Sequence, residues 1–121
     1  MARLAQSGAP GSYIDIRNLR WSETEKAIAR KAFEHALQKE LEEVVHKTQR
    51  MASTIHQPSD LWELESFLTR RRKEIDDKFD YRYSVLPEVF GALVREGRVY
   101  EDELRGLAED KLAYIRRYAK F

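Results

Sequence analysis

Residues 22–57 read SETEKAIARKAFEHALQKELEEVVHKTQRMASTIHQ and contain neither glycine nor proline. The stretch opens with Ser22 and Glu25 in the S-x-x-E spacing of a helix capping box. Pro58 follows its last residue, and proline is poorly tolerated inside a helix. The sequence therefore predicts one long helix over about 22–56.

The length of this helix bears on how the chain assembles. About 34 helical residues, at ~1.5 Å each, give a rod of ~50 Å. A compact chain of 121 residues has a diameter of only about 35 Å. The rod therefore overhangs any globule that the chain builds by itself, and a second copy is the simplest cover for the overhang. We expect an extended helical homodimer.

A row of mostly apolar residues along this helix is the expected dimer interface. Its members are spaced alternately four and three residues apart, as in a heptad seam, and one of them is a threonine. They are Leu37, Leu41, Val44, Thr48, Met51 and Ile55. Packing of the same row against the chain's own core is the alternative.

The rest of the chain also predicts helices, so the expected class is all-α. A second helix is expected over about 60–79, with Asp60 and Glu63 as its capping pair. Two head helices are expected over about 85–96, before Gly97, and about 100–119. We assign residues 21–121 to a single domain. Residues 1–20 are expected to form a flexible leader, with a cloning remnant as an alternative origin for part of it.

Composition narrows the range of functions. The chain has no cysteine, and its 22 basic and 21 acidic residues nearly balance. No run approaches the roughly 20 apolar residues of a membrane span, so we expect a cytoplasmic protein. No catalytic motif occurs, and the spacing of His35, His46 and His56 favours surface positions over metal ligands. We expect no enzymatic activity, no metal and no cofactor.

Basic runs keep a nucleic-acid-associated regulator open as an alternative. They are Arg70-Arg71-Arg72-Lys73 and Arg116-Arg117. Four consecutive helical residues point in nearly all directions, so the first run cannot form one stripe along a phosphate backbone. A solvated helix face with ion pairs between residues four apart is the favoured interpretation.

One side of the second helix has the composition of a protein-binding site. Trp62 points away from the leucine stripe of this helix, and Glu65, Ser66 and Thr69 share its side. Arg72 lies at the boundary of that side. Exposed tryptophan beside arginine is typical of binding hot spots. The alternative is that Trp62 is buried against the first helix or a dimer mate.

The same helix carries a resemblance to a known family. The chain resembles the fluorescence recovery proteins of cyanobacteria, with the match extending from Trp21-Ser22 through Glu96-Gly97 to Ala108-Glu109-Asp110-Lys111. Its specific part comprises Asp60-Leu61-Trp62-Glu63-Leu64-Glu65-Ser66-Phe67-Leu68, Arg71-Arg72-Lys73-Glu74-Ile75-Asp76, Lys78-Phe79-Asp80 and Arg82-Tyr83-Ser84-Val85. The resemblance implies an all-helical homodimer without a cofactor. It also implies binding to the C-terminal domain of the photoactivated orange carotenoid protein, faster return of that protein to its resting form, and the end of phycobilisome quenching.

The resemblance also assigns roles to single residues. Trp62 and Arg72 correspond to the tryptophan and arginine of the family's working patch. Glu65 and Ser66 stand where the family carries a His-Asp pair, and Glu88 stands where an aromatic or apolar residue is expected. These departures indicate a divergent member. They leave open a relative with a different protein client, in a bacterium without this photoprotective system.

Overall fold

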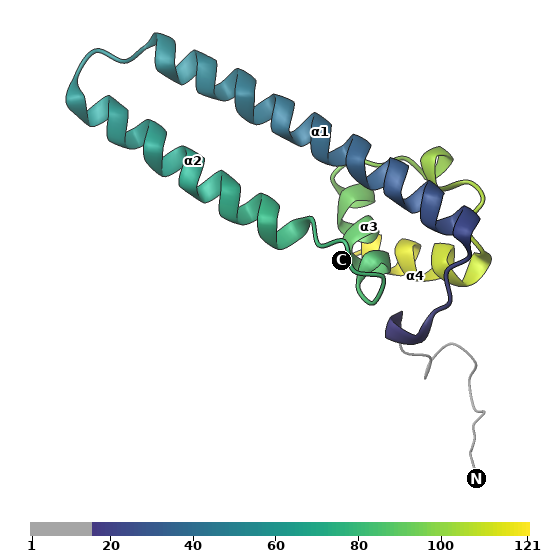
Figure 1. Cartoon of the computed structure of the whole chain (residues 1–121). Coiled ribbons are helices and arrows are strands. Elements are labelled where there is room, and N and C mark those ends of the chain that lie inside the picture. Colours follow the sequence, from purple (N-terminus) through teal and green to yellow (C-terminus); the bar gives the residue numbers. More distant parts are fainter. Residues whose placement is uncertain (1–15) are drawn as a thin grey trace.

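The computed structural model describes residues 16–121, and its helices confirm the all-α class. In Figure 1, α1 and α2 run side by side in opposite directions as a long hairpin, and α3 and α4 pack at the other end of α1 as a compact head. The helices in chain order are η1 (Ile16–Asn18, 3-10), α1 (Glu23–Ser53), α2 (Pro58–Lys78), α3 (Leu86–Arg95), η2 (Glu101–Leu104, 3-10) and α4 (Glu109–Ala119).

The start of α1 confirms the predicted capping box. The Glu25 backbone N–H donates to Ser22 Oγ at 3.1 Å, and the Ser22 N–H donates to Glu25 Oε1 at 2.9 Å. The helix ends at Ser53, a little before the expected residue 56. Ser53 and Thr54 donate their hydroxyls to carbonyls of the last turn, at 2.7 and 3.0 Å, and such bonds compete with the helical pattern.

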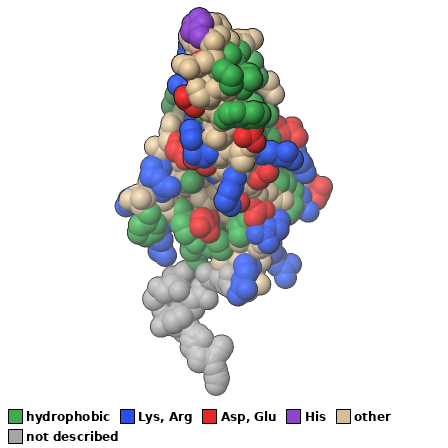
Figure 2. Space-filling view, turned by 90° about the vertical axis from the view of Figure 1, so that its left-hand side faces the viewer, with side chains coloured by type: hydrophobic (Ala, Val, Ile, Leu, Met, Phe, Trp, Pro, Cys, Tyr) green, Lys and Arg blue, Asp and Glu red, His purple; other side chains and the backbone are tan. Residues whose placement is uncertain are grey.

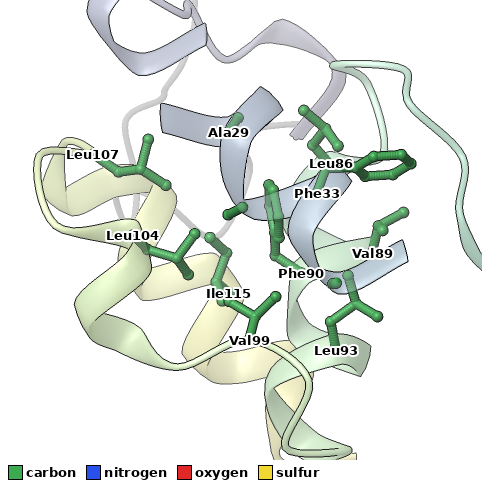
Figure 3. Packing of buried hydrophobic residues seen from close by; sticks show 12 residues of the cluster. Ala29, Phe33, Leu86, Val89, Phe90, Leu93, Val99, Leu104, Leu107 and Ile115 are labelled. Atoms are coloured by element: carbon green, nitrogen blue, oxygen red, sulfur yellow. The ribbon is translucent and has the colours of Figure 1, made fainter. Parts of the chain in front are cut away.

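The head contains the apolar core, and the first turns of α1 supply one of its walls. Alanines of α1 face the buried side chains of α3, η2 and α4 (Figure 3), and the ring of Phe33 packs edge-on against Phe79 and Tyr81. The buried members of this core are Ala29, Ala32, Phe33, Ala36, Leu86, Val89, Phe90, Leu93, Val99, Leu104, Leu107 and Ile115. α1 therefore belongs to both the head and the hairpin.

The expected helix over 100–119 is wrong in its first half. Residues Glu101–Leu104 form the 3-10 segment η2, and α4 begins only at Glu109. Gly106 lies between them with φ of 107°, a backbone conformation that favours glycine and does not fit a right-handed helix. The leucines on either side of the break, Leu104 and Leu107, are both buried, and a Cβ at Gly106 would lie only 2.5 Å from Ile28 Cδ1 of α1.

A buried ion pair fixes the entry to α1 against the head. Lys111 is 3% exposed, and its Nζ lies 3.1 Å from Glu25 Oε1 and donates to the Arg20 carbonyl. The ring of Trp21 lies over the same ammonium, with 5.5 Å from Nζ to the ring centroid. Residues 16–20 of the expected leader thus include η1 and a carbonyl bound to the head, whereas residues 1–15 lie outside the described part of the chain.

Candidate functional site

The hairpin turn places α2 antiparallel to α1. The α2 helix starts at Pro58 with Gln57 as N-cap, and its end bounds are close to those expected. Asp60 is the third residue of the helix, where Oδ2 accepts the backbone N–H groups of His56 and Gln57 at 2.9 and 3.1 Å. The predicted pairing of Asp60 with Glu63 is therefore wrong, because the carboxylate of Asp60 reaches back to the turn.

The inner side of α2 is anchored by two apolar and two basic residues. Phe67 and Ile75 are buried, with exposures of 9% and 7%. Arg71 and Lys78 share this side, and both reach the buried carboxylate of Glu40 on α1, at 2.7 Å each. This inner side fixes the rotation of α2 about its axis and so decides which residues remain in solvent.

The outer side of α2 presents all five residues of the expected partner-binding patch. Trp62, Glu65, Ser66, Thr69 and Arg72 follow one another at helical spacing, and each is exposed in the single chain. Trp62 is 65% exposed and the side chain of Arg72 is 86% exposed. We call these five residues the α2 patch.

Two observations describe how the α2 patch is prepared for a partner. Arg72 has only a loose ion pair with Asp76, with 3.8 Å between Nε and Oδ2, so its guanidinium stays available. A shallow hollow lies beside it, lined by Thr69, Arg72, Lys73, Asp76 and Asp77. Burial of Trp62 against α1 does not occur, whereas cover by a second copy is still an alternative.

The residues of the expected dimer seam on α1 differ in how far the single chain buries them. Leu37 packs against the head core of its own chain, and Val44, Thr48, Met51 and Ile55 are half-buried in the hairpin. Leu41 is 41% exposed, and Val45 beside it is 51% exposed. On α2, Leu61 and Leu68 of the leucine stripe are 48% and 39% exposed.

These exposed apolar residues belong to the hairpin. In Figure 2, hydrophobic side chains gather near the upper end, where the hairpin turn lies, above a belt in which Lys and Arg alternate with Asp and Glu. A single chain therefore leaves apolar area on its hairpin in contact with water.

The basic residues that kept a nucleic-acid site open are largely bound to acids. Arg71 turns inward to Glu40 and Glu74, and Lys73 lies 3.0 Å from Asp77. Arg116 pairs with Glu101 and Glu109, at 2.9 and 3.1 Å. This pattern is that of a solvated, internally neutralised surface.

Sequence reasoning missed the role of Glu40. This residue occupies a core-facing position of α1, one turn after the buried Ala36, and is 1% exposed. An acidic residue at an apolar position of a periodic pattern is the signal that could have identified it. Its partners could not have been identified, because one of them, Arg98, is 58 residues away in the chain.

The histidines lie on the surface. His35 Nδ1 lies 2.9 Å from Glu103 Oε1, and His46 and His56 are exposed. Burial raises the pKa of Glu103, but the Tyr100 N–H and His35 lower it more, so the net pKa is below its ordinary value. Within residues 16–121, no three His, Asp or Glu side chains are grouped as a metal site would require. The helices in that range include none long and apolar enough to cross a membrane.

Glu88 lies on the exposed side of α3, in the first turn of that helix. A carboxylate is favourable at this end of a helix because it faces the positive end of the helix dipole. The charge therefore fits the local structure without entering the core.

Comparison with known proteins gives a consistent result. The model of a family described as "Photoprotection regulator fluorescence recovery protein" matches residues 21–119. The fluorescence recovery protein of Synechocystis sp. strain PCC 6803 is 43% identical over 100 residues, which cover 83% of this chain and 92% of the relative. The solved structure of the Fremyella diplosiphon fluorescence recovery protein superimposes with a TM-score of 0.80 at 38% identity. It covers 84% of this chain and 100% of the other. The Synechocystis structure gives the same TM-score and the same two coverages at 42% identity.

Proposed function

The chain belongs to the fluorescence recovery protein family of photoprotection regulators, and we propose that it acts in the cytoplasm by binding the photoactivated orange carotenoid protein. In this proposal the α2 patch contacts the C-terminal domain of that client and speeds its return to the resting form. The observation that carries the proposal is an exposed Trp62 and an available Arg72, about 15 Å apart along the same side of a helix whose opposite side is anchored.

The chemistry of the patch supports a binding role. A tryptophan at 65% exposure leaves a large apolar ring in water, and burying it against a partner is favourable. Arginine adds a planar group that pairs with carboxylates or stacks on rings. Both residue types are enriched at the energetic centres of protein interfaces.

The proposed mechanism is differential binding. A protein that binds its client equally well in all states shifts no equilibrium and lowers no barrier. Acceleration requires that the patch hold the transition state of client closure more tightly than the open, active state. No covalent step is involved in this mechanism.

We also propose that the working form is a homodimer joined through the hairpins. The support is the apolar area that one chain leaves exposed on both arms, at Leu41 and Val45 of α1 and Leu61 and Leu68 of α2. Exposed apolar side chains that gather on one part of a soluble protein mark interaction sites. The proposed interface includes the half-buried part of the seam, from Val44 to Ile55.

A specific observation favours a second candidate client. Glu65 and Ser66 are both exposed at the centre of the α2 patch. They replace the His-Asp pair expected there with an acid followed by a neutral residue, which changes the order of charge and hydrogen-bonding groups presented to a partner. A divergent relative with another protein client would keep the same fold and the same Trp62 and Arg72.

Size-exclusion chromatography with light scattering tests the proposal. The protein is run alone and mixed with photoactivated orange carotenoid protein, and recovery of the resting absorbance is followed in the same samples. A dimer that co-elutes with the client and accelerates recovery is the expected result. A dimer that neither binds nor accelerates would rule out this client and favour the second candidate.

A further inference from the structure

A buried carboxylate lies where the hairpin joins the head. Glu40, near the middle of α1, is 1% exposed. Its Oε2 accepts a hydrogen bond from Arg71 Nη2 at 2.7 Å. Its Oε1 lies 2.7 Å from Lys78 Nζ and 3.0 Å from Arg98 Nε, at ion-pair distance but without the alignment of a regular hydrogen bond.

The three cations come from two different parts of the molecule. Arg71 and Lys78 lie on the inner side of α2, whereas Arg98 lies in the turn that follows α3 in the head. The single carboxylate of Glu40 therefore contacts the two elements that must keep a fixed orientation if hairpin and head are to act as one body. We call Glu40 with these three cations the arm–head joint.

Each cation of the joint also binds a more exposed acid. Arg71 pairs with Glu74 at 2.6 Å, and Lys78 pairs with Glu96 at 2.8 Å. Arg98 makes two bonds to Glu43, at 2.8 and 3.0 Å. These three outer acids offset the positive charge of the cations on their solvent side. Of the four acids, Glu40 is the one that is buried among the cations.

Glu40 is charged in the folded protein. Burial raises the pKa of its carboxyl. Close contacts with Lys78 and Arg71 and attraction by Arg98 lower this pKa by more than burial raises it, so the net pKa lies below its ordinary value. Hydrogen bonds to Glu40 and Glu74 raise the pKa of Arg71. The hydrogen bond to Glu43, with a smaller attraction by Glu40, raises the pKa of Arg98. The hydrogen bonds and ion pairs of the joint depend on the orientation of their groups, unlike the apolar contacts of the core.

Such a cluster is better suited to fixing geometry than to adding stability. A buried ion pair is often no more stabilising than apolar residues of similar volume, because desolvation offsets the attraction. Removing the anion, however, leaves three like charges facing one another. Next to the joint, the segment that follows α2 packs on the head core, where Phe79 lies edge-on against Phe33, with 5.4 Å between ring centroids.

We propose that Glu40 is a positioning residue, whose buried carboxylate holds α2 and the head at a fixed relative orientation. Loss of its charge frees α2 to move away from the head while both remain helical. The functional consequence rests on the proposed function: while Glu40 holds the joint together, the α2 patch and the head meet a client as one rigid surface.

The experiment measures the orientation directly in the full chain. The protein has no cysteine, so spin labels can be attached at Glu63→Cys on α2 and Glu88→Cys on α3, both exposed positions. Labelled chains are diluted into unlabelled protein, so that each distance is measured within one chain. Double electron–electron resonance then gives the distribution of α2–head distances in the absence of any client.

In this experiment Glu40→Gln is expected to broaden the distribution and shift its mean to longer distance, with unchanged helix content by circular dichroism. Glu43→Gln is the matched control. Glu43 lies one turn away and binds the same Arg98, but its side chain is 61% exposed, so its loss leaves the distribution narrow. An unchanged distribution in Glu40→Gln, or equal broadening in Glu43→Gln, overturns the proposal.

A second variant covers the case in which Glu40→Gln fails to fold. Arg98→Gln removes only the cation from the head and leaves Glu40 bound to α2. It is expected to broaden the same distribution, and a narrow distribution in a folded Arg98→Gln protein also overturns the proposal.

The client assay separates the joint from the proposed function. Glu40→Gln is expected to reduce client affinity by about fivefold or more, a typical size for coupling between distant sites. A broadened distance with undiminished affinity overturns the functional consequence but not the joint. Failure of the unmodified protein to bind the client contradicts the proposed function and leaves the distance measurement as an independent test.

Discussion

Trp62 and Lys111 occupy environments opposite to those that their side chains usually prefer. Trp62 is 65% exposed, whereas Lys111 is 3% exposed. An exposed tryptophan keeps its binding surface available, and a buried lysine persists because Glu25 and a backbone carbonyl satisfy its charge and hydrogen bonds. The first residue therefore bears on the proposed binding and the second on stability.

Truncating the α2 patch is expected to weaken binding without unfolding the chain. Trp62→Ala and Arg72→Ala should each cost about 1–3 kcal/mol of client binding, because each removes a central contact group. Titration calorimetry measures the affinity, and circular dichroism checks the helix content. Glu63→Ala, next to Trp62 but on another side of α2, is the control and should bind normally. Loss of helix in Trp62→Ala would show that this residue is part of a folded core.

Acid is expected to destabilise the protein through its buried carboxylates. Burial raises the pKa of Glu25, but hydrogen bonds from Ser22, Ala108 and Lys111 lower it below its ordinary value of 4.5. A lowered folded-state pKa adds stability above the unfolded pKa, and this stability is lost as the pH falls through the folded pKa. The loss is therefore expected below about pH 4.5.

Glu25→Gln tests this pH dependence. At about pH 7 the variant should be about 3 kcal/mol less stable, because the buried amino group of Lys111 loses its carboxylate partner. The difference should shrink towards about pH 4, where the carboxyl of the unmodified protein begins to be protonated. Urea unfolding followed by circular dichroism gives both values. Glu23→Gln, with a side chain 92% exposed, should leave the curve unchanged, and a constant difference for Glu25→Gln would contradict the prediction.

The four α-helices described contribute to the structure in different ways. α1 supplies a wall of the head core with its first turns and one arm of the hairpin with the rest. α2 is anchored on one side and exposed on the other, which suits a helix that presents a binding patch. α3 and α4 pack closely against each other, and Gly91 lies at their contact.

The close contact at Gly91 predicts that a larger side chain there destabilises the packing of α3 on α4. A Cβ at this position would lie 2.3 Å from Tyr118 Cβ and 3.0 Å from the backbone of α4. Gly91→Ala gains about 1 kcal/mol of helix propensity, but overpacking costs about 1–3 kcal/mol, so we expect net destabilisation. The urea midpoint should fall, whereas Glu88→Ala, on the exposed side of the same helix, should hardly change it. A raised midpoint for Gly91→Ala would mean that α3 and α4 separate easily.

The whole molecule is a head with a projecting hairpin. The last ion pair described between α1 and the head joins Glu43 to Arg98, and beyond it α1 runs beside α2 in the hairpin. The apolar residues exposed on the hairpin carry an aggregation risk in an isolated chain. A second copy packed on the hairpin removes this risk.

Leu41→Glu tests this assembly. A charge at a residue that is 41% exposed in the single chain should leave the fold intact but place an unpaired carboxylate in the proposed interface. Light scattering should then report the mass of one chain in place of two, with unchanged helix content. Ala27→Glu, at an exposed position of α1 beside the head, should remain dimeric. A dimeric Leu41→Glu would place the interface elsewhere.

Local signals in the sequence determined the helices and the patch. The capping box at Ser22 and Glu25 and the absence of glycine and proline up to Pro58 determined α1. The helical spacing of Trp62 and Arg72 placed them on one side of α2, because side-chain direction repeats every 3.6 residues whatever the surroundings. Gly97 after α3, with φ of 75°, likewise follows from a local backbone preference.

Contacts between distant residues decided what the pattern could not. At Gly106 the chain breaks where its backbone comes close to Ile28 of α1, and Leu61 and Leu68 stay exposed because Phe67 and Ile75 face α1. The ion pairs of Glu40 and of Lys111 join residues up to 86 positions apart. Whether a charged residue is buried depends on the free energy of its partners in space, and no periodic pattern along the chain contains that information.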